Sequence, residues 1–401
     1  MTIQQQSLPL PKPKQSSLLT TGLALFSMFF GAGNLIFPLM IGQSVGCNAW
    51  YAISGLAVTA VVVPFLGLAA MVLFQGDYSR FFGRIGKVPG LMLLLMLQLI
   101  LGPFGVIPRL ITLMHAMASP YLFDMSLLSF SILSGAVLFA FSFKRDWLIN
   151  FLGAILTPVL LVALAALMFF GLLDGSSAPS VDALPMASFF EGLLGGYNTM
   201  DLIAAFLFAT VILPHFQKEA VKGNPEEGHK SILKKIGLSS LIAAALLLLT
   251  YVGLCLIAAR HAPAASASFA PEQLLNIIAV KLLGPAGGCI AAIAVMTACL
   301  TTAMTLASIF SDYLRKDICK DKINPTWALV ATLAVTTLFA NLGFSGIAAF
   351  LGPILQVVYP GLILLTVLNL FHALYGYRMV KLPVFLAFGF SGMIDFIPNL
   401  I

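Results

Sequence analysis

The chain has 401 residues, of which 60% are apolar and only 9% are charged, and it carries a net charge of +6 with a mean hydropathy of +1.02. This composition excludes a soluble enzyme with one membrane anchor, because no polar stretch is long enough to form a separate domain. The polar residues 1–16 lack the apolar core of a cleaved signal peptide, so we expect the first apolar segment to stay in the membrane.

About eleven apolar segments are long enough to cross a bilayer, which takes about 20 helical residues. They are residues 17–45, 48–74, 88–116, 122–142, 147–172, 187–216, 235–258, 285–311, 325–341, 345–371 and 382–400. The short amphipathic stretch 272–283 is expected to form a helix on the membrane surface. Because the last segment contains Asp395 and Pro398, it is expected to form either a full span or a hairpin.

A connector rich in Gly, Ser and Pro, residues 174–186, separates two sets of five spans. We therefore expect a tail at 1–16, a first five-helix set at 17–173, the connector outside the cell, a second set at 187–371, and a C-terminal segment at 372–401. This is the domain organisation that the sequence predicts.

The basic residues indicate the orientation of the spans. If the N-terminus is cytoplasmic, all of the 21 Lys and Arg residues except Arg109, Arg260 and Lys281 fall in the tail or in inner loops. Lys and Arg favour the cytoplasmic ends of spans, so this distribution predicts a cytoplasmic N-terminus. It also accounts for the net positive charge without a nucleic-acid partner.

Two apolar segments contain a Gly-x-x-Asn sequence near the middle: Gly31-Ala32-Gly33-Asn34 and Gly195-Gly196-Tyr197-Asn198. Glycines weaken a membrane helix, and an unwound turn frees amide groups that can bind a carboxylate and carbonyl groups that can bind a cation. Interrupted helices at corresponding positions in two halves point to the binding site of a secondary transporter. The alternative is close helix packing through small residues.

Two charged residues lie inside predicted spans. Asp201 follows the second glycine pair, and it can bind a cation, carry a proton, or cap the helix that follows. Arg109 directly follows Pro108, which together with Pro103 is expected to kink this span, and it either pairs with a buried acid or lines the transport pathway.

Adjacent hydroxyls occur at Thr301 and Thr302 in the eighth span. Hydroxyls at such positions usually bond to a carbonyl one turn earlier, but two of them can also supply hard oxygen ligands to a sodium ion. The chain has no Gly-Lys-Ser/Thr phosphate loop and no His-Glu-x-x-His sequence, so an ATP-driven pump and enzymatic activity are disfavoured.

Four segments resemble those of the bacterial branched-chain amino acid:cation symporters, within the amino acid–polyamine–organocation superfamily. They span much of the chain in the same order: Leu25 to Pro38, Gly102 to Arg109, Gly196 to Asp201, and Ala298 to Ala303. The resemblance implies an all-α polytopic protein with the leucine-transporter fold, in which two inverted five-helix repeats place broken helices one and six around the substrate. Members of the family usually have about twelve spans, one more than this chain is predicted to have.

The resemblance also implies which residues bind the ligands. The substrate would be held by two segments, Gly31, Ala32, Gly33 and Asn34 together with Gly196, Tyr197, Asn198 and Thr199. The first would bind the carboxylate through backbone amides. A sodium ion would be held by carbonyls and hydroxyls of Ser27, Phe30, Ala298, Thr301 and Thr302.

The sequence therefore predicts an importer of leucine, isoleucine and valine, coupled to Na⁺ or H⁺, in a bacterial inner membrane. No cofactor, nucleic acid or obligate protein partner is expected. The alternatives are an exchanger or uniporter of the same fold for other apolar amino acids such as methionine, and a channel or membrane sensor. The absence of charged rings from the sequence disfavours the channel.

Overall fold

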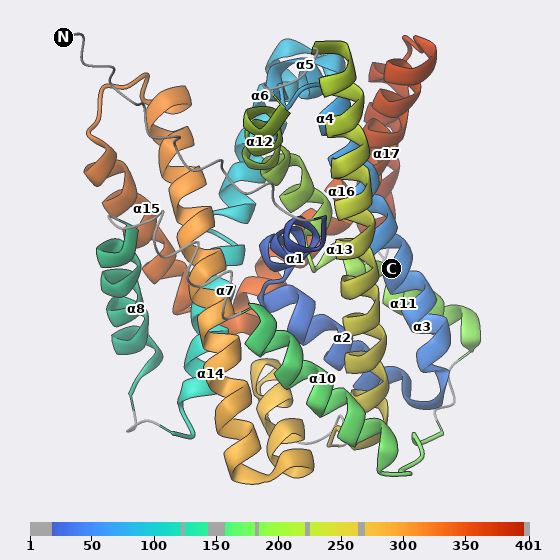
Figure 1. The fold of residues 1–401 in the computed structure, drawn as a ribbon, viewed down its shortest axis with the longest axis vertical. Helices are drawn as coiled ribbons and strands as arrows, with labels where there is room; N and C mark the ends of the chain where they lie inside the picture. The colour runs from blue at the N-terminus through green and yellow to red at the C-terminus, as the bar shows by residue number, and fades with distance from the viewer. Residues whose placement is uncertain are drawn as a thin grey trace, which may run out of the picture.

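The computed structural model describes residues 18–121, 125–142, 157–180, 184–220, 225–263 and 269–396, and in this part of the chain all regular structure is helical (Figure 1). The helices are α1 (Leu18–Phe29), α2 (Ala32–Val45), α3 (Ala49–Ala57), α4 (Val63–Leu73), α5 (Tyr78–Phe82), α6 (Lys87–Leu101), α7 (Val106–Ala118), α8 (Leu127–Ser142), α10 (Thr157–Leu173), α11 (Pro185–Tyr197), α12 (Asp201–Ala220), α13 (Pro225–His261), α14 (Leu274–Tyr313), α15 (Pro325–Ala340), α16 (Gly343–Tyr375) and α17 (Lys381–Phe396).

Within the described residues, six helical stretches are long and apolar enough to cross a membrane: Ala32–Leu73, Lys87–Ala118, Pro185–Thr210, Lys234–His261, Pro271–Ile318 and Gly343–Tyr375. Five shorter apolar helices accompany them. Many large apolar side chains face outward, among them those of Trp50, Leu241 and Phe390. An outer surface of this kind suits the lipid of a bilayer, so the chain is a membrane protein.

The first and sixth predicted spans each consist of two helices with a short non-helical link. The first becomes α1 and α2, and the sixth becomes α11 and α12. The second predicted span contains α3 and α4, joined by the π-helical turn Val58–Val62. Residues 143–156, which include the start of the fifth predicted span, lie outside the described part, as do residues 397–401 at the end of the last one.

The third predicted span differs from the sequence expectation. A kink was predicted at its prolines, but the helix stops completely, with α6 ending at Leu101 and α7 starting at Val106. Two glycines bound the link, and their backbones lie too close to neighbouring atoms for a side chain: a Cβ at Gly105 would stand 2.2 Å from the oxygen of Ile100. Arg109 consequently lies in the first turn of a new helix.

The amphipathic stretch 272–283 was expected to form a helix on the membrane surface, and most of it is helical. Its helical part begins α14 and is separated from the rest of that helix by Gly284, which has φ 71°. Leu274, Leu275 and Ile278 are each at most 1% exposed. One part of its apolar face thus packs against the protein.

Close helix crossings hold the interrupted helices in place. Helix α13 packs along both α1 and α2, and α11 packs along α3. A Cβ at Gly42 would stand 2.1 Å from the oxygen of Cys255 on α13, and one at Gly192 would stand 1.9 Å from the oxygen of Ala52 on α3. Backbones can approach this closely only where a side chain is missing, as is common between membrane helices.

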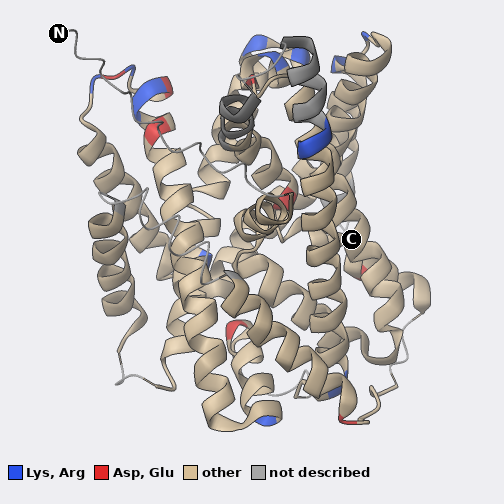
Figure 2. Ribbon diagram, viewed as in Figure 1, with Lys and Arg blue, Asp and Glu red and all other residues tan. Residues whose placement is uncertain are grey.

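The charged residues of the described part lie mainly at the two ends of the helices. In Figure 2, Lys and Arg gather at the upper end of the molecule, and only a few lie at the lower end. Arg80 lies in α5, and after α14 an ion pair joins Arg315 to Asp321, with atoms 2.7 Å apart. The long middle zone between the two ends is almost free of charge, as the interior of a bilayer requires.

The crossing of α11 and α3 predicts that Gly192→Ala destabilises the protein. The added methyl group must displace the backbone at Ala52, and overpacking of this kind costs about 1–3 kcal/mol. The loss is measured as a lowered Tm in detergent. Gly237→Ala in α13 is the matched control, because nothing lies within 4 Å of its Cβ position. Equal melting temperatures for the two variants would contradict this role for Gly192.

Candidate functional site

The first helix break lies at Phe30 and Gly31, between α1 and α2. Gly33 and Asn34, which the sequence places within the break, instead form part of the first turn of α2. The side chain of Asn34 turns back toward the break, where its Oδ1 accepts a hydrogen bond of 3.0 Å from the amide of Gly31. This bond satisfies an amide that would otherwise lack a partner in lipid, and it fixes the place where α2 begins.

The second break covers residues 198–200, between α11 and α12. Met200 is left-handed, with φ 62°, a conformation that costs free energy for any residue but glycine. Gly195 and Gly196 were expected to open the helix, but both lie inside the last turn of α11. A Cβ at Gly196 would stand 2.0 Å from the hydroxyl oxygen of Thr59, so this glycine serves helix packing.

The two breaks touch each other through their backbones. A Cβ at Gly33 would stand 3.1 Å from the Cα of Thr199 and 3.3 Å from the oxygen of Asn198. The N-terminal turn of α2 therefore lies directly against the link before α12. Two chain segments more than 160 residues apart in sequence form one site, as the pattern of paired interruptions predicts.

A buried hydrogen-bond network joins the breaks. The Nδ2 group of Asn34 donates to both carboxylate oxygens of Asp201, at 2.9 and 2.8 Å. The hydroxyl of Tyr251 on α13 donates to Oδ2 of Asp201 at 2.8 Å and also contacts Asn34. Asn34 and Asp201 are each at most 2% exposed, and Tyr251 is 1% exposed. The carboxylate, at the first residue of α12, also faces the positive end of that helix.

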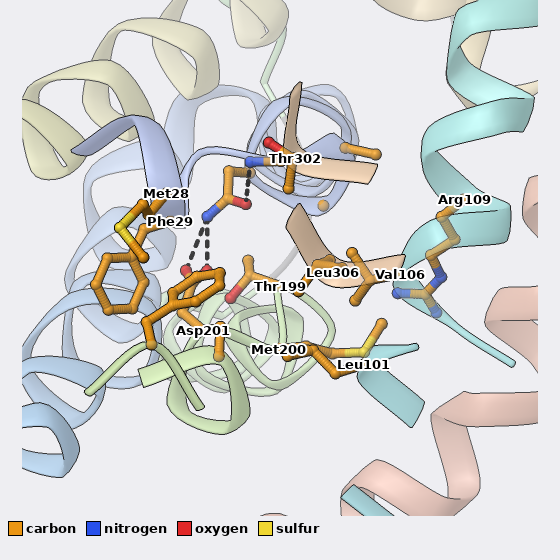
Figure 3. A pocket seen from close by; sticks show the side chains of 16 residues that line it. Met28, Phe29, Leu101, Val106, Arg109, Thr199, Met200, Asp201, Thr302 and Leu306 are labelled. Atoms are coloured by element: carbon orange, nitrogen blue, oxygen red, sulfur yellow. Dashed lines mark hydrogen bonds between the residues drawn. The ribbon is translucent and has the colours of Figure 1, made fainter. Parts of the chain in front are cut away.

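These residues surround a small cavity between the two breaks (Figure 3). Its volume of about 20 Å³ is enough for roughly one water molecule. Its lining includes polar groups from the breaks and apolar side chains from α1, α6, α7, α12 and α14. The apolar part of the lining comprises Met28, Phe29, Leu101, Val106, Met200, Ala204, Phe208 and Leu306.

Arg109 lines the same cavity and is 1% exposed. Its Nη1 donates a hydrogen bond of 3.0 Å to the oxygen of Asn198 in the second break. The guanidinium carbon lies 5.4 Å from the ring centres of both Phe37 and Phe344. Among the described residues, no acidic side chain is paired with Arg109, so the structure favours the lining role over the buried ion pair.

The hydroxyls of Thr301 and Thr302 both donate to the oxygen of Ala298, at 2.7 and 3.1 Å. Of the two, only Thr302 lines the cavity, and its methyl carbon lies 4.0 Å from the Cβ position of Gly31. Helix α14 thus faces the first break at Thr302. Ser27 lies in the last turn of α1, and Phe30 directly follows that helix in the first break.

The structure brings most of the expected residues together. Those that line the cavity are Gly31, Ala32, Gly33, Asn34, Arg109, Thr199, Asp201 and Thr302. Tyr197 does not; its ring stacks on that of Tyr359, with centres 4.7 Å apart. Sequence reasoning missed Tyr251, although a hydroxyl in the middle of an apolar span is a signal of function or pairing. Within the described chain, no group of three His, Cys, Asp or Glu residues is placed to hold a metal ion.

Asn34→Ala is predicted to lower the free energy of unfolding by about 1–3 kcal/mol, because the change removes both the cap of Gly31 and two donors to a buried carboxylate. Thermal unfolding in detergent measures the loss. The control is Asn341→Ala. The exposed side chain of Asn341 makes a local hydrogen bond to the oxygen of Thr337, and its removal should change the free energy of unfolding by less than about 0.5 kcal/mol. A melting temperature for Asn34→Ala equal to that of the control would show that the network contributes nothing.

Comparison with known structures shows the fold. The inward-facing conformation of Mhp1 matches 95% of this chain and 89% of that chain, with a TM-score of 0.61 at 13% identity. A Na⁺-coupled sialic acid symporter in a substrate-bound outward-open state matches with the same coverage, a TM-score of 0.53 and 12% identity. The helices thus follow an arrangement shared with these secondary transporters.

Sequence comparison shows the family. The family model described as a branched-chain amino acid transport protein matches residues 14–400. The branched-chain amino acid permease BrnQ of Corynebacterium glutamicum is 33% identical over 365 residues, which are 90% of this chain and 82% of that protein. BraB of Bacillus subtilis, also a branched-chain amino acid permease, is 31% identical over 371 residues, 89% of this chain and 80% of that one. The resemblance inferred from the sequence motifs is confirmed: the chain belongs to the family of branched-chain amino acid transport proteins, which are membrane transporters and not enzymes.

Proposed function

We propose that the protein imports leucine, isoleucine and valine by coupled transport with a cation, through alternating access to the cavity between the two helix breaks. The observation that carries this proposal is the meeting of both breaks at Gly33 and Thr199, where backbone groups from two halves of the chain face one cavity. The permease names of the relatives support the substrate class.

The lining suits an apolar zwitterion. Arg109 and Asp201 lie on opposite sides of the cavity in Figure 3, and the amides at the start of α2 can bind a carboxylate. The aliphatic side chain of the substrate would contact Phe29, Phe208 and Leu306. Since one methylene group is worth only about 1–3 kcal/mol, we expect weak discrimination among the three amino acids.

Alternating access requires that the cavity enlarge, because about 20 Å³ is far too small for an amino acid. We infer that the helix pairs carrying the breaks separate on one side of the membrane at a time. The contact between Gly33 and Thr199 lies where such a motion would open the site. The expected layout behind it is two inverted five-helix repeats, with about eleven spans and helices α1–α2 and α11–α12 as the first helix of each repeat.

The cation is proposed to bind beside the first break. The sodium site would be formed by the carbonyls of Ser27 in the last turn of α1, Phe30 in the first break and Ala298, together with the hydroxyls of Thr301 and Thr302. Asp201 is the candidate carrier if the coupling ion is H⁺. The basic end of the molecule in Figure 2 would face the cytoplasm, with the N-terminus there and the protein in a bacterial inner membrane.

Such coupling supplies enough energy for import. One cation that enters with ~100 mV gains about 2.3 kcal/mol. A tenfold cation gradient adds about 1.4 kcal/mol. With tight one-to-one coupling, these terms sustain roughly a 500-fold accumulation of a neutral amino acid.

Uptake of labelled isoleucine into proteoliposomes tests the proposed function under three conditions: a sodium gradient, a proton gradient, and none. We expect accumulation with one of the two gradients, and excess leucine or valine should compete. Uptake that depends on neither gradient but is accelerated by amino acid inside the vesicles would indicate an exchanger and contradict cation coupling.

Two substitutions separate the cation candidates. If sodium binds at Thr302, Thr302→Ala should raise the sodium concentration for half-maximal uptake about tenfold or more, whereas Thr302→Ser, which keeps the hydroxyl, should change it little. If protons are carried by Asp201, Asp201→Asn should abolish proton-driven accumulation. Sodium dependence that is the same in Thr302→Ala as in the unchanged protein would rule out the proposed sodium site.

A further inference from the structure

Arg109 has two donor groups that the protein does not use. Its Nε and Nη2 atoms are buried and have no hydrogen-bond partner within the described chain. Leaving a buried donor without a partner is unfavourable, and more so when the donor is charged. Arg109 is 1% exposed and lines the cavity where the two helix breaks meet. Its two free N–H donors can therefore bind a ligand in that cavity.

The unused donors lie along one edge of the guanidinium plane. Nη1 is held by the oxygen of Asn198, and the rings of Phe37 and Phe344 lie near the guanidinium group. These contacts fix the orientation of the group and leave the Nε–Nη2 edge, whose two N–H bonds point in parallel. Two parallel donors on one edge match the two oxygens of a carboxylate.

The charge of Arg109 also has no counterion within the described residues. Asp201, the acidic residue in the cavity lining, accepts its hydrogen bonds from Asn34 and Tyr251. A buried charge without a partner is strongly unfavourable, so an anionic group bound at Arg109 would offset that cost.

Arg109 and the start of α2 approach the same atom. The oxygen of Asn198 lies 3.0 Å from Nη1 of Arg109 and 3.3 Å from the Cβ position of Gly33. The guanidinium is therefore next to the first turn of α2, whose amides point out of the helix end.

We propose that Arg109 binds the α-carboxylate of the transported amino acid through Nε and Nη2. The inference rests on the proposed function and assigns the charge-bearing contact of that site. It makes Arg109 a determinant of specificity: the transporter would require a free carboxylate on its substrate, whatever the aliphatic side chain. The alternative is that Arg109 only ties α2, α7 and α16 together through Phe37 and Phe344.

Binding of leucine and of leucinol, which has the same side chain and ammonium group but no carboxylate, distinguishes the two roles in purified protein. Unchanged protein should bind leucine far more tightly than leucinol. Arg109→Gln should weaken leucine binding by about 10- to 100-fold and leave leucinol binding nearly unchanged, because leucinol never uses the lost donors. Arg109→Lys keeps the charge but lacks the two-donor edge, and should give an intermediate loss.

The control is Arg80→Gln. The side chain of Arg80 is exposed and paired with Asp77 outside the cavity, so this variant should bind both ligands as the unchanged protein does. Equal loss of leucine and leucinol binding in Arg109→Gln would overturn the inference, as would no loss of either. Unchanged protein that binds no leucine at all would overturn the proposed function itself, and the inference with it.

A measurement on the unchanged protein decides the matter if neither variant folds. The chain has seven arginines, so ¹⁵N labelling at Nε gives few signals. Leucine should move one Nε–H proton signal downfield by charge-assisted hydrogen bonding, and leucinol should not. If leucine binds but none of the seven Nε–H signals changes its chemical shift, the inference is overturned.

Discussion

The side chain of Asn34 is the link on which the site depends. Its oxygen accepts from the amide of Gly31, and its nitrogen donates to the carboxylate of Asp201. A membrane helix can be interrupted only if the freed backbone groups find partners, since lipid supplies none. One amide side chain meets that requirement at the first break and ties it to the second.

The rest of the architecture keeps these breaks together. Two helix crossings bring backbones close because glycines have no side chain: Gly42 of α2 lies against α13, and Gly192 of α11 lies against α3. The breaks themselves meet through backbone at Gly33 and Thr199 and are joined by one hydrogen-bond network. In the lining of the cavity, the charged residues are Asp201 on one side and Arg109 on the other. This arrangement suits a ligand that is neutral overall but carries both a positive and a negative group.

Local sequence signals predicted the helices and the existence of both breaks, because glycine, asparagine and proline act on their own turn of backbone. They did not give the positions of the breaks, since the first is set by the capping bond of Asn34, and Gly195 and Gly196 pack against Ile41 and Thr59 instead of opening the helix. The partners of Asp201 and Arg109 were also beyond local reasoning. Tyr251 and the carbonyl of Asn198 lie 50 and 89 residues away from them in sequence.

The most direct test of this account is an experimental structure of the protein with leucine bound, in a lipid nanodisc. The account predicts ligand density between the start of α2 and the link before α12, with the carboxylate at Arg109 and the aliphatic end against Phe29 and Phe208. Density for leucine at any other place, with the two breaks still in contact and Asn34 still bonded to Asp201, would contradict it.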